Sequence, residues 1–214
     1  MKKLISLLLV AAMICCVMAG CGGSKEAQAL VGTWKADVDT TELMTETMGA
    51  DMAEFVTLED VVFTMVFKFN SDGTYSVTLD EASVQVALEG VLQAVKDGTV
   101  AMLEAQIAEY GMDMSVEDML AASGTDLDTV FAQMEEQMNL PALAAQTIAE
   151  ASHEGKYDAK EGKLFLSAGL DYLPDPECYE VYTLEGNVLT LLEYVGDDDG
   201  NFDGLYPLIF NKVA

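Results

Sequence analysis

The chain has 214 residues, and its 37 acidic residues outnumber its ten basic residues, all lysines, so the formal net charge at pH 7 is −27. This charge repels nucleic acid, anionic lipid headgroups and phosphorylated substrates, and no arginine is present to supply the two-pronged guanidinium that favours phosphate recognition. Neutral, apolar or cationic partners are compatible with it, and so is a charge that only keeps an exposed protein soluble.

The N-terminus has the layout of a secretory signal peptide. Lys2 and Lys3 precede an uncharged apolar run over residues 4–18, which ends in the small residues Ala19 and Gly20. A membrane-spanning helix, which needs about 20 apolar residues, is the alternative interpretation.

The position of the third cysteine favours the signal peptide. Met18-Ala19-Gly20-Cys21 resembles the lipobox of bacterial lipoproteins. The resemblance implies cleavage after residue 20, lipidation of Cys21 and anchoring to the cell membrane on its extracytoplasmic side, where two acyl chains hold far better than one. We therefore expect a signal peptide over 1–20 and a lipidated cysteine with a flexible tether over 21–29.

The remaining cysteine is expected to be structural. Cys15 and Cys16 leave with the signal peptide and Cys21 carries lipid, so Cys178 has no partner for an intramolecular disulfide. Its neighbours are tyrosine and valine, which favours a small buried hydrophobic residue over a nucleophile.

Alternating apolar and polar residues predict eight strands. Thr74–Leu79 alternates cleanly, and the turn at Asn70–Gly73 joins it to the strand before it as a hairpin. Similar hairpins are expected around Gly162 and Gly186. The predicted strands cover 31–38, 61–69, 74–79, 155–159, 163–168, 178–184, 188–194 and 205–212. Eight antiparallel strands in hairpin order indicate a closed meander barrel.

Residues 81–152, between the third and fourth strands, follow a helical pattern instead. Apolar residues recur at helical spacing at Val84, Leu88, Val91, Leu92 and Val95, and again at Leu127, Val130, Phe131, Met134 and Met138. Caps are expected at Ser115, which has Asp118 three residues later, and at Thr125, while Pro141 suits a first helical turn. The spacing predicts three to five helices here, and one shorter helix over 41–55 with Met44, Met48 and Met52 on one face.

Several segments resemble the bacterial lipocalin-like lipoprotein domains. Gly32-Thr33-Trp34 matches the Gly-x-Trp at which lipocalins begin, and the stretches at 67–77, 155–167, 182–191 and 208–213 follow in the family's order. The resemblance implies an α+β fold: a lipocalin-like, eight-stranded antiparallel meander barrel over 30–214, with a long helical insertion between strands 3 and 4. It also implies that Trp34 closes one barrel end by packing. The insertion departs from the family pattern and could lie across the barrel mouth as a lid or as a plug.

A barrel of eight strands either holds one small ligand or is filled by its own side chains. Alternation and methionine content select the candidate ligand-binding residues, which are Phe63, Met65, Phe67, Phe69, Tyr75, Val77, Met119 and Met134. The methionines suit a surface that repacks around varied apolar shapes, although they also serve as core filler. A copper(I) site at Met112 and Met114 is disfavoured because no His or Cys is nearby.

The acidic loop at 196–204 is a candidate for weak calcium binding. Asp199, Asn201 and Asp203 match the first half of a calcium-loop spacing, and Asp197 could add an oxygen ligand. Phe210 occupies the position of the usual bidentate glutamate, and a solvated turn built from Asp, Asn and Gly is the alternative. We expect no other cofactor.

Two functional hypotheses follow, and both describe a non-catalytic protein, because the single histidine, His153, has no serine motif nearby. The first is a binding lipoprotein whose barrel, under its helical lid, holds a small apolar or neutral ligand. The second is a cell-envelope interaction protein whose helical insertion docks a partner protein. Neither involves nucleic acid.

Overall fold

The computed structural model describes residues 24–196 and 205–213. The predicted signal peptide, the lipidated Cys21 and the candidate calcium ligands Asp197, Asp199, Asn201 and Asp203 lie outside the described residues. The chain divides into two compact units. The barrel unit comprises the residues up to 36 together with 65–78 and the residues from 152 onward, and the helical unit comprises 37–64 and 79–151.

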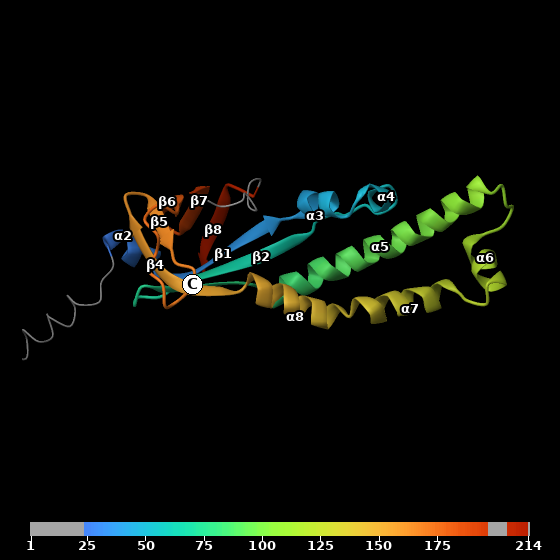
Figure 1. The fold of residues 1–214 in the computed structure, drawn as a ribbon, viewed down its shortest axis with the longest axis horizontal. Coiled ribbons are helices and arrows are strands. Elements are labelled where there is room, and N and C mark those ends of the chain that lie inside the picture. Colours follow the sequence, from blue (N-terminus) through green and yellow to red (C-terminus); the bar gives the residue numbers. More distant parts are fainter. Residues whose placement is uncertain (1–23, 197–204, 214) are drawn as a thin grey trace, which may run out of the picture. The chain divides into compact units, whose positions relative to one another are not determined.

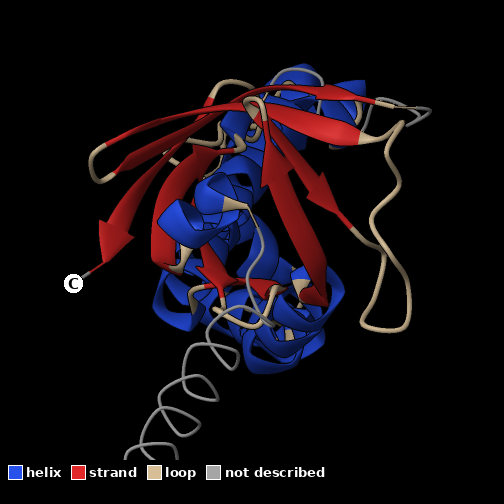
Figure 2. Ribbon diagram, turned by 90° about the vertical axis from the view of Figure 1, so that its left-hand side faces the viewer, coloured by secondary structure: helices blue, strands red, loops and turns tan. Residues whose placement is uncertain are grey.

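Eight antiparallel strands close into a barrel in which sequence neighbours pair and β8 returns to β1 (Figure 1). The strands are β1 (Gly32–Asp39), β2 (Val62–Phe69), β3 (Thr74–Leu79), β4 (His153–Lys160), β5 (Lys163–Leu166), β6 (Tyr179–Glu185), β7 (Val188–Val195) and β8 (Leu208–Val213). Figure 2 shows the strands curving around one another. The predicted eight-stranded antiparallel barrel is confirmed, with strand ends that differ by a few residues.

The hairpin turns follow the predicted chemistry. At Asn70–Gly73 the backbone amide of Asn70 donates to the carbonyl of Thr74 at 2.8 Å, and Asp72 accepts from the amide of Thr74 at 3.0 Å. Gly73 has φ of +85°, a backbone conformation that residues with a side chain rarely adopt. The turn residues therefore fix the register of β2 against β3 locally.

Residues predicted as part of a tether form a helix instead. Helix α2 (Lys25–Leu30) begins at the N-cap Ser24, whose hydroxyl accepts from the amide of Ala27 at 3.0 Å. Ala27 and Leu30 are buried. The Tyr157 hydroxyl donates to the carbonyl of Ala27, and the Trp34 indole donates to the carbonyl of Leu30, so both strand residues fix the helix to the barrel. The prediction of a flexible segment over 25–29 was therefore wrong. Six residues are too few to show a helical period of apolar residues in the sequence.

The insertion between β3 and β4 consists of four helices, as the predicted range of three to five allowed: α5 (Glu81–Glu109), α6 (Val116–Ala122), α7 (Leu127–Met138) and α8 (Leu140–Ala151). Val84 and Leu88 on α5 pack with Ala144 on α8 in a buried cluster. Ser115 and Asp118 form the expected capping box on α6. Helix α7 is capped by Asp126 rather than by the predicted Thr125, because the Asp126 carboxylate accepts from the amide of Thr129 at 2.7 Å.

The segment between β1 and β2 holds two short helices where one was predicted. Helix α3 (Thr41–Thr47) and helix α4 (Ala50–Ala53) are separated at Gly49, whose φ of +81° is incompatible with a continuing helix. Met44 and Met48 pack on the cluster of Val56, Leu58, Val61 and Ala87, whereas Met52 is exposed. No helix among residues 24–196 and 205–213 is long and apolar enough to cross a membrane.

Candidate functional site

The predicted ligand-binding residues do not meet in one place. Phe67, Phe69 and Tyr75 are buried in the barrel unit. Phe63 packs in the helical unit against Val84 and its neighbours, and Met119 packs in a separate cluster around Ile107. The remaining three candidates, Met65, Val77 and Met134, are half-buried. Alternation along β2 could not show that the strand passes from one unit into the other between Thr64 and Met65.

Aromatic rings pack together in the barrel core. The Phe67 ring lies 5.2 Å from that of Phe69, 6.0 Å from Tyr75 and 5.5 Å from Phe210. Phe69 in turn meets Tyr157 edge-to-face at 4.8 Å. These separations are those of direct ring contact. The side chains predicted to line a ligand cavity are therefore in contact with one another.

The buried tyrosine hydroxyls are also engaged within the protein. Tyr75 donates to the carbonyl of Ser167 at 2.9 Å, and Tyr157 lies 3.1 Å from the carbonyls of Ala27 and Asn70. Burial raises the pKa of both tyrosines to about 12, with the charges of Asp72 and Asp158 adding to the effect at Tyr157. Both hydroxyls are therefore neutral donors at physiological pH.

The single histidine does not face a nucleophile. A ring nitrogen of His153 lies 3.3 Å from the carbonyl oxygen of Ser167, not from its hydroxyl. That hydroxyl accepts from the amide of Lys156 at 2.7 Å and donates to the carbonyl of Gly169 at 2.9 Å. The backbone packs closely here, since a Cβ on Gly155 would lie 2.4 Å from the Ser167 carbonyl oxygen.

Cys178 is a free thiol of intermediate exposure that precedes β6. The cysteine is therefore less buried than predicted, and the prediction that it is structural rather than a nucleophile stays a prediction. The tyrosines and valine around it alternate along the strand that begins at Tyr179, and the cysteine stands one residue outside that strand.

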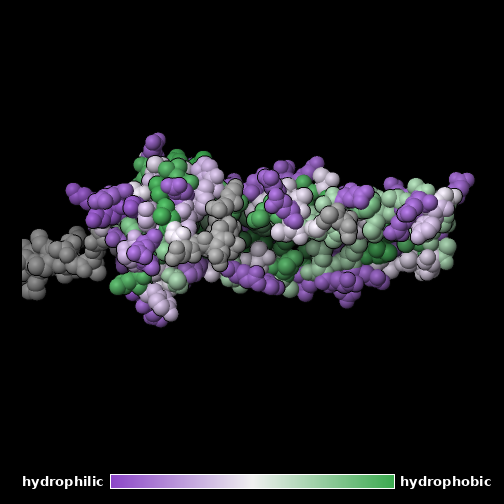
Figure 3. Space-filling view, turned by 45° about the horizontal axis from the view of Figure 1, so that its top comes forward, coloured by the Kyte–Doolittle hydropathy of each residue, from purple (hydrophilic) through white to green (hydrophobic). Residues whose placement is uncertain are grey.

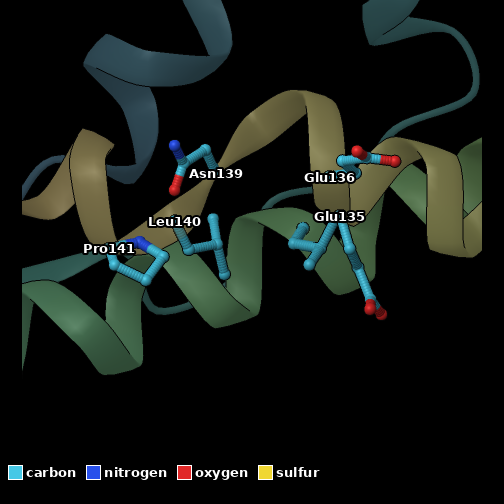
Figure 4. A pocket seen from close by; sticks show the side chains of 6 residues that line it. Glu135, Glu136, Asn139, Leu140 and Pro141 are labelled. Carbon is cyan, nitrogen blue, oxygen red and sulfur yellow. The ribbon is translucent and has the colours of Figure 1, made fainter.

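The helical unit contains an open groove of about 590 Å³ where α7 gives way to α8. The two helices are separated by Asn139, which has φ of +43° and ends α7 in the left-handed conformation. The lining residues are Leu92, Glu135, Glu136, Asn139, Leu140 and Pro141. Figure 4 shows Leu140 between this break and α5, with Glu135 and Glu136 directed to different sides. The groove thus has an apolar floor and an acidic rim.

One lysine lies beside this groove. The Lys96 ammonium is 2.5 Å from a carboxylate oxygen of Glu135 and 5.4 Å from the centre of the Phe131 ring. Glu135 and Glu136 are both exposed. The pairing joins α5 to α7 and offsets part of the charge of Glu135.

A second groove of about 510 Å³ lies in the same unit between α5 and residues 55–59. Its lining residues are Phe55, Thr57, Glu59, Gly90, Gln93, Ala94, Asp97 and Ala101. Three of the lining residues on α5 are small: Gly90, Ala94 and Ala101. Next to the groove, Gly98 lets the backbone of Phe55 approach the helix, since a Cβ there would lie 2.8 Å from the Phe55 carbonyl oxygen.

Charge is divided unequally between the units. Residues 37–64 and 79–151 contain 22 of the 37 acidic residues and one of the ten lysines, Lys96. Figure 3 shows hydrophobic surface between hydrophilic edges over the helical part of the chain. The two grooves therefore lie in the most acidic part of the molecule. Sequence reasoning missed both; Asn139 followed by Pro141 is a helix-boundary signal that marks the break between α7 and α8 but not the groove itself.

Within the part of the chain that the structure describes, no group of three or more His, Cys, Asp or Glu side chains is arranged to hold a metal ion. The predicted calcium loop is not among those residues, so that prediction stays open.

Comparison with known proteins gives no match: no family model, no curated protein and no solved structure is similar to this chain.

Proposed function

We propose that this protein is a lipid-anchored, extracytoplasmic, non-catalytic protein of the cell envelope, in which a lipocalin-like barrel is the scaffold and the helical unit binds a cationic amphipathic segment of another protein. The lipocalin-like assignment is supported by the meander order of the eight strands and by the buried Trp34 just after the first glycine of β1. The anchor is supported by the lipobox-like sequence that ends at Cys21.

The observation that carries the binding proposal is the contrast between the two units. The barrel core is packed with aromatic rings, whereas the helical unit has an open groove with Leu92, Leu140 and Pro141 on its surface and Glu136 on its rim. A basic amphipathic helix would place its apolar face in such a groove and its lysines or arginines against the acidic rim. The groove therefore favours a cationic amphipathic partner over a small ligand in the barrel.

A direct test uses two designed peptides of the same length, one of Leu and Lys and one of Leu and Glu in the same helical pattern. The soluble chain from Ser24 onward should bind the basic peptide saturably in calorimetry, with an affinity that falls as salt rises. Glu136→Lys should weaken binding about tenfold, and Glu104→Lys, an equal charge change on exposed α5 surface, should weaken it by about threefold or less. Equal affinity for the two peptides, or equal effects of the two variants, would refute the proposal.

A small apolar ligand is the second candidate, because the same groove exposes Leu140 and Pro141. Native mass spectrometry of the protein purified from its own host tests it. A retained small molecule that Leu140→Asp releases would support this candidate, and an unliganded mass would count against it.

The anchor is tested separately. The full-length protein made in its host should partition into the detergent phase after Triton X-114 extraction, and Cys21→Ser should move it to the aqueous phase. Aqueous partitioning of the unaltered protein would refute lipid anchoring.

A further inference from the structure

One end of the barrel gathers α2 and the short strand connections. The strand pairings place the start of β1 and the end of β8 at the same end as the turns at 70–73, 161–162 and 186–187. We call this the anchor end. The longer excursions, at 40–61, 80–152, 167–178 and 196–207, all leave from the opposite end.

The chain is fixed to the barrel from Ser24 onward. The Ser24 hydroxyl donates to the carbonyl of Ala159, the last residue but one of β4. Glu26 accepts from the amide of Gly162 and from the hydroxyl of Tyr182, both at 3.2 Å. At the other end of α2, the Trp34 indole donates to the carbonyl of Leu30 at 2.7 Å. These contacts join α2 to β1, β4 and β6, so the helix is part of the barrel unit and not of a tether.

The free length between lipid and barrel is therefore short. Cys21 precedes Ser24 by three residues, and three extended residues span at most about 11 Å. The barrel itself, with strands of up to eight residues at about 3.3 Å each, separates its two ends by roughly 20–25 Å. A chain of this length brings the anchor end to the bilayer surface and leaves the opposite end beyond its reach.

The lysines are distributed in agreement with that geometry. Of the eight lysines after residue 20, seven lie in the barrel unit. Lys25 is exposed beside Ser24. The Lys160 side chain is 68% exposed, and Lys160 lies opposite Lys163 in the backbone register of β4 and β5. Acidic residues occur here as well, with Glu161 3.9 Å from Lys160. The whole-chain charge predicts repulsion from anionic headgroups, but most of that charge lies in the helical unit, which holds 22 of the 37 acidic residues and one of the ten lysines.

We propose that the anchor end is a membrane-facing surface, which lies on the anionic bilayer that holds the lipid, with Lys25 and Lys160 next to the headgroups. The proposal rests on the lipid anchoring proposed above. Val188 and Val213, which are 37% and 44% exposed at the same end, add apolar contact.

The experiment uses the full-length lipidated protein with Cys178→Ser, reconstituted in vesicles that contain phosphatidylglycerol and a headgroup-located quencher lipid. Single cysteines carrying a fluorophore are placed at the anchor end (Ser71→Cys and Asn187→Cys) and at the opposite end (Asp171→Cys and Leu173→Cys), all at exposed positions. Quenching at the anchor-end positions should exceed that at the opposite-end positions by at least about threefold, because contact quenching does not reach across 20 Å.

Two variants test the causes. Insertion of 20 Gly and Ser residues between Gly23 and Ser24 should remove most of the difference, since such a linker has an end-to-end distance of roughly 25 Å. Lys25→Glu with Lys160→Glu should reduce quenching in anionic vesicles and leave it unchanged in phosphatidylcholine vesicles.

The outcomes separate this inference from the anchoring on which it depends. A wild-type protein that fails to float with the vesicles refutes the anchor and, with it, the orientation. Flotation with equal quenching at the two ends, or with stronger quenching at the opposite end, refutes the orientation alone.

Discussion

At the scale of single residues, Trp34 holds the barrel and α2 together. Its side chain is fully buried, and its indole nitrogen donates to the carbonyl of Leu30, which is also fully buried. Trp34→Phe leaves that carbonyl without its donor, and a buried unsatisfied group costs about 1–3 kcal/mol. We expect the free energy of unfolding to fall by at least that amount in urea denaturation followed by far-UV circular dichroism. Ile209→Ala, at an exposed barrel position, is the control, and an equal loss in the two variants would contradict the assigned role.

Glu26 gives the α2 attachment a pH dependence. The backbone hydrogen bond from Gly162, followed by that from Glu161, lowers the pKa of the Glu26 carboxyl below its ordinary value of 4.5. A lowered pKa in the folded state contributes stability that is present above the unfolded pKa and is lost as the pH falls through the folded pKa.

Glu26→Gln should therefore lower the melting temperature at neutral pH. The difference from the wild type should shrink at pH values below about 4.5, where the wild type loses the same contribution. Thermal melts across pH 3–8 measure this, with the exposed Glu104→Gln as the matched control. A difference that stays constant down to the lowest pH would show that the carboxylate charge is not involved.

At the scale of elements, two glycines of α5 separate helix propensity from packing. A Cβ on Gly90 would meet nothing within 4 Å, whereas a Cβ on Gly98 would lie 2.5 Å from a methyl carbon of Val56 and 2.8 Å from the Phe55 carbonyl oxygen. Gly90→Ala should stabilise the protein by about 0.5–1 kcal/mol, since alanine is the better helix former.

Gly98→Ala gains the same propensity but should destabilise by about 1–3 kcal/mol, because it forces residues 55–56 away from the helix. Chemical denaturation of the two variants checks the difference in sign. If Gly98→Ala were as stable as Gly90→Ala, the close approach of this segment to α5 would be wrong.

The elements also show what the sequence can and cannot predict. The barrel order followed from local signals: alternation at Thr74–Leu79 and turn residues such as Gly73 and Gly186 depend on neighbours a few positions away. Helix α2 depends on the burial of Ala27 and Leu30 against the barrel, and the break between α3 and α4 depends on the backbone angle of Gly49. Neither feature changes the periodicity of apolar residues in the sequence. The groove at Asn139 needs three helices in contact, so it could not be read from any one of them. The separation of the candidate ligand-binding residues has the same cause, because side chains on one strand face, such as Phe63 and Phe67, lie in different units.

At the scale of the whole molecule, the barrel core is built without the helical unit. The largest fully buried side chains of the barrel unit come from its strands and from α2, and they are Leu30, Trp34, Phe69, Leu164, Leu189 and Phe210. Val77 pairs with His153, and the amide of Thr40 donates to the carbonyl of Val61, so both helical excursions begin and end at neighbouring points.

Replacing residues 40–60 and 78–152 each with Asn-Gly should therefore leave a folded barrel, since this dipeptide suits a tight hairpin. Near-UV circular dichroism and the emission of Trp34 should keep native features, and thermal unfolding should stay cooperative. Removal of both segments is needed because Val56 and Leu58 pack against α5 and would otherwise be exposed. A variant with the spectrum of an unfolded chain would mean that the barrel needs the helices to fold.

The pairing of β8 with β1 has a further consequence for the lipid-anchored protein proposed above. Copies that share a membrane collide far more often than copies in solution, and an unpaired strand edge would invite them to join into growing sheets. In the described barrel, every strand already has a hydrogen-bonded neighbour on both sides. Ring closure therefore guards against aggregation at high two-dimensional density.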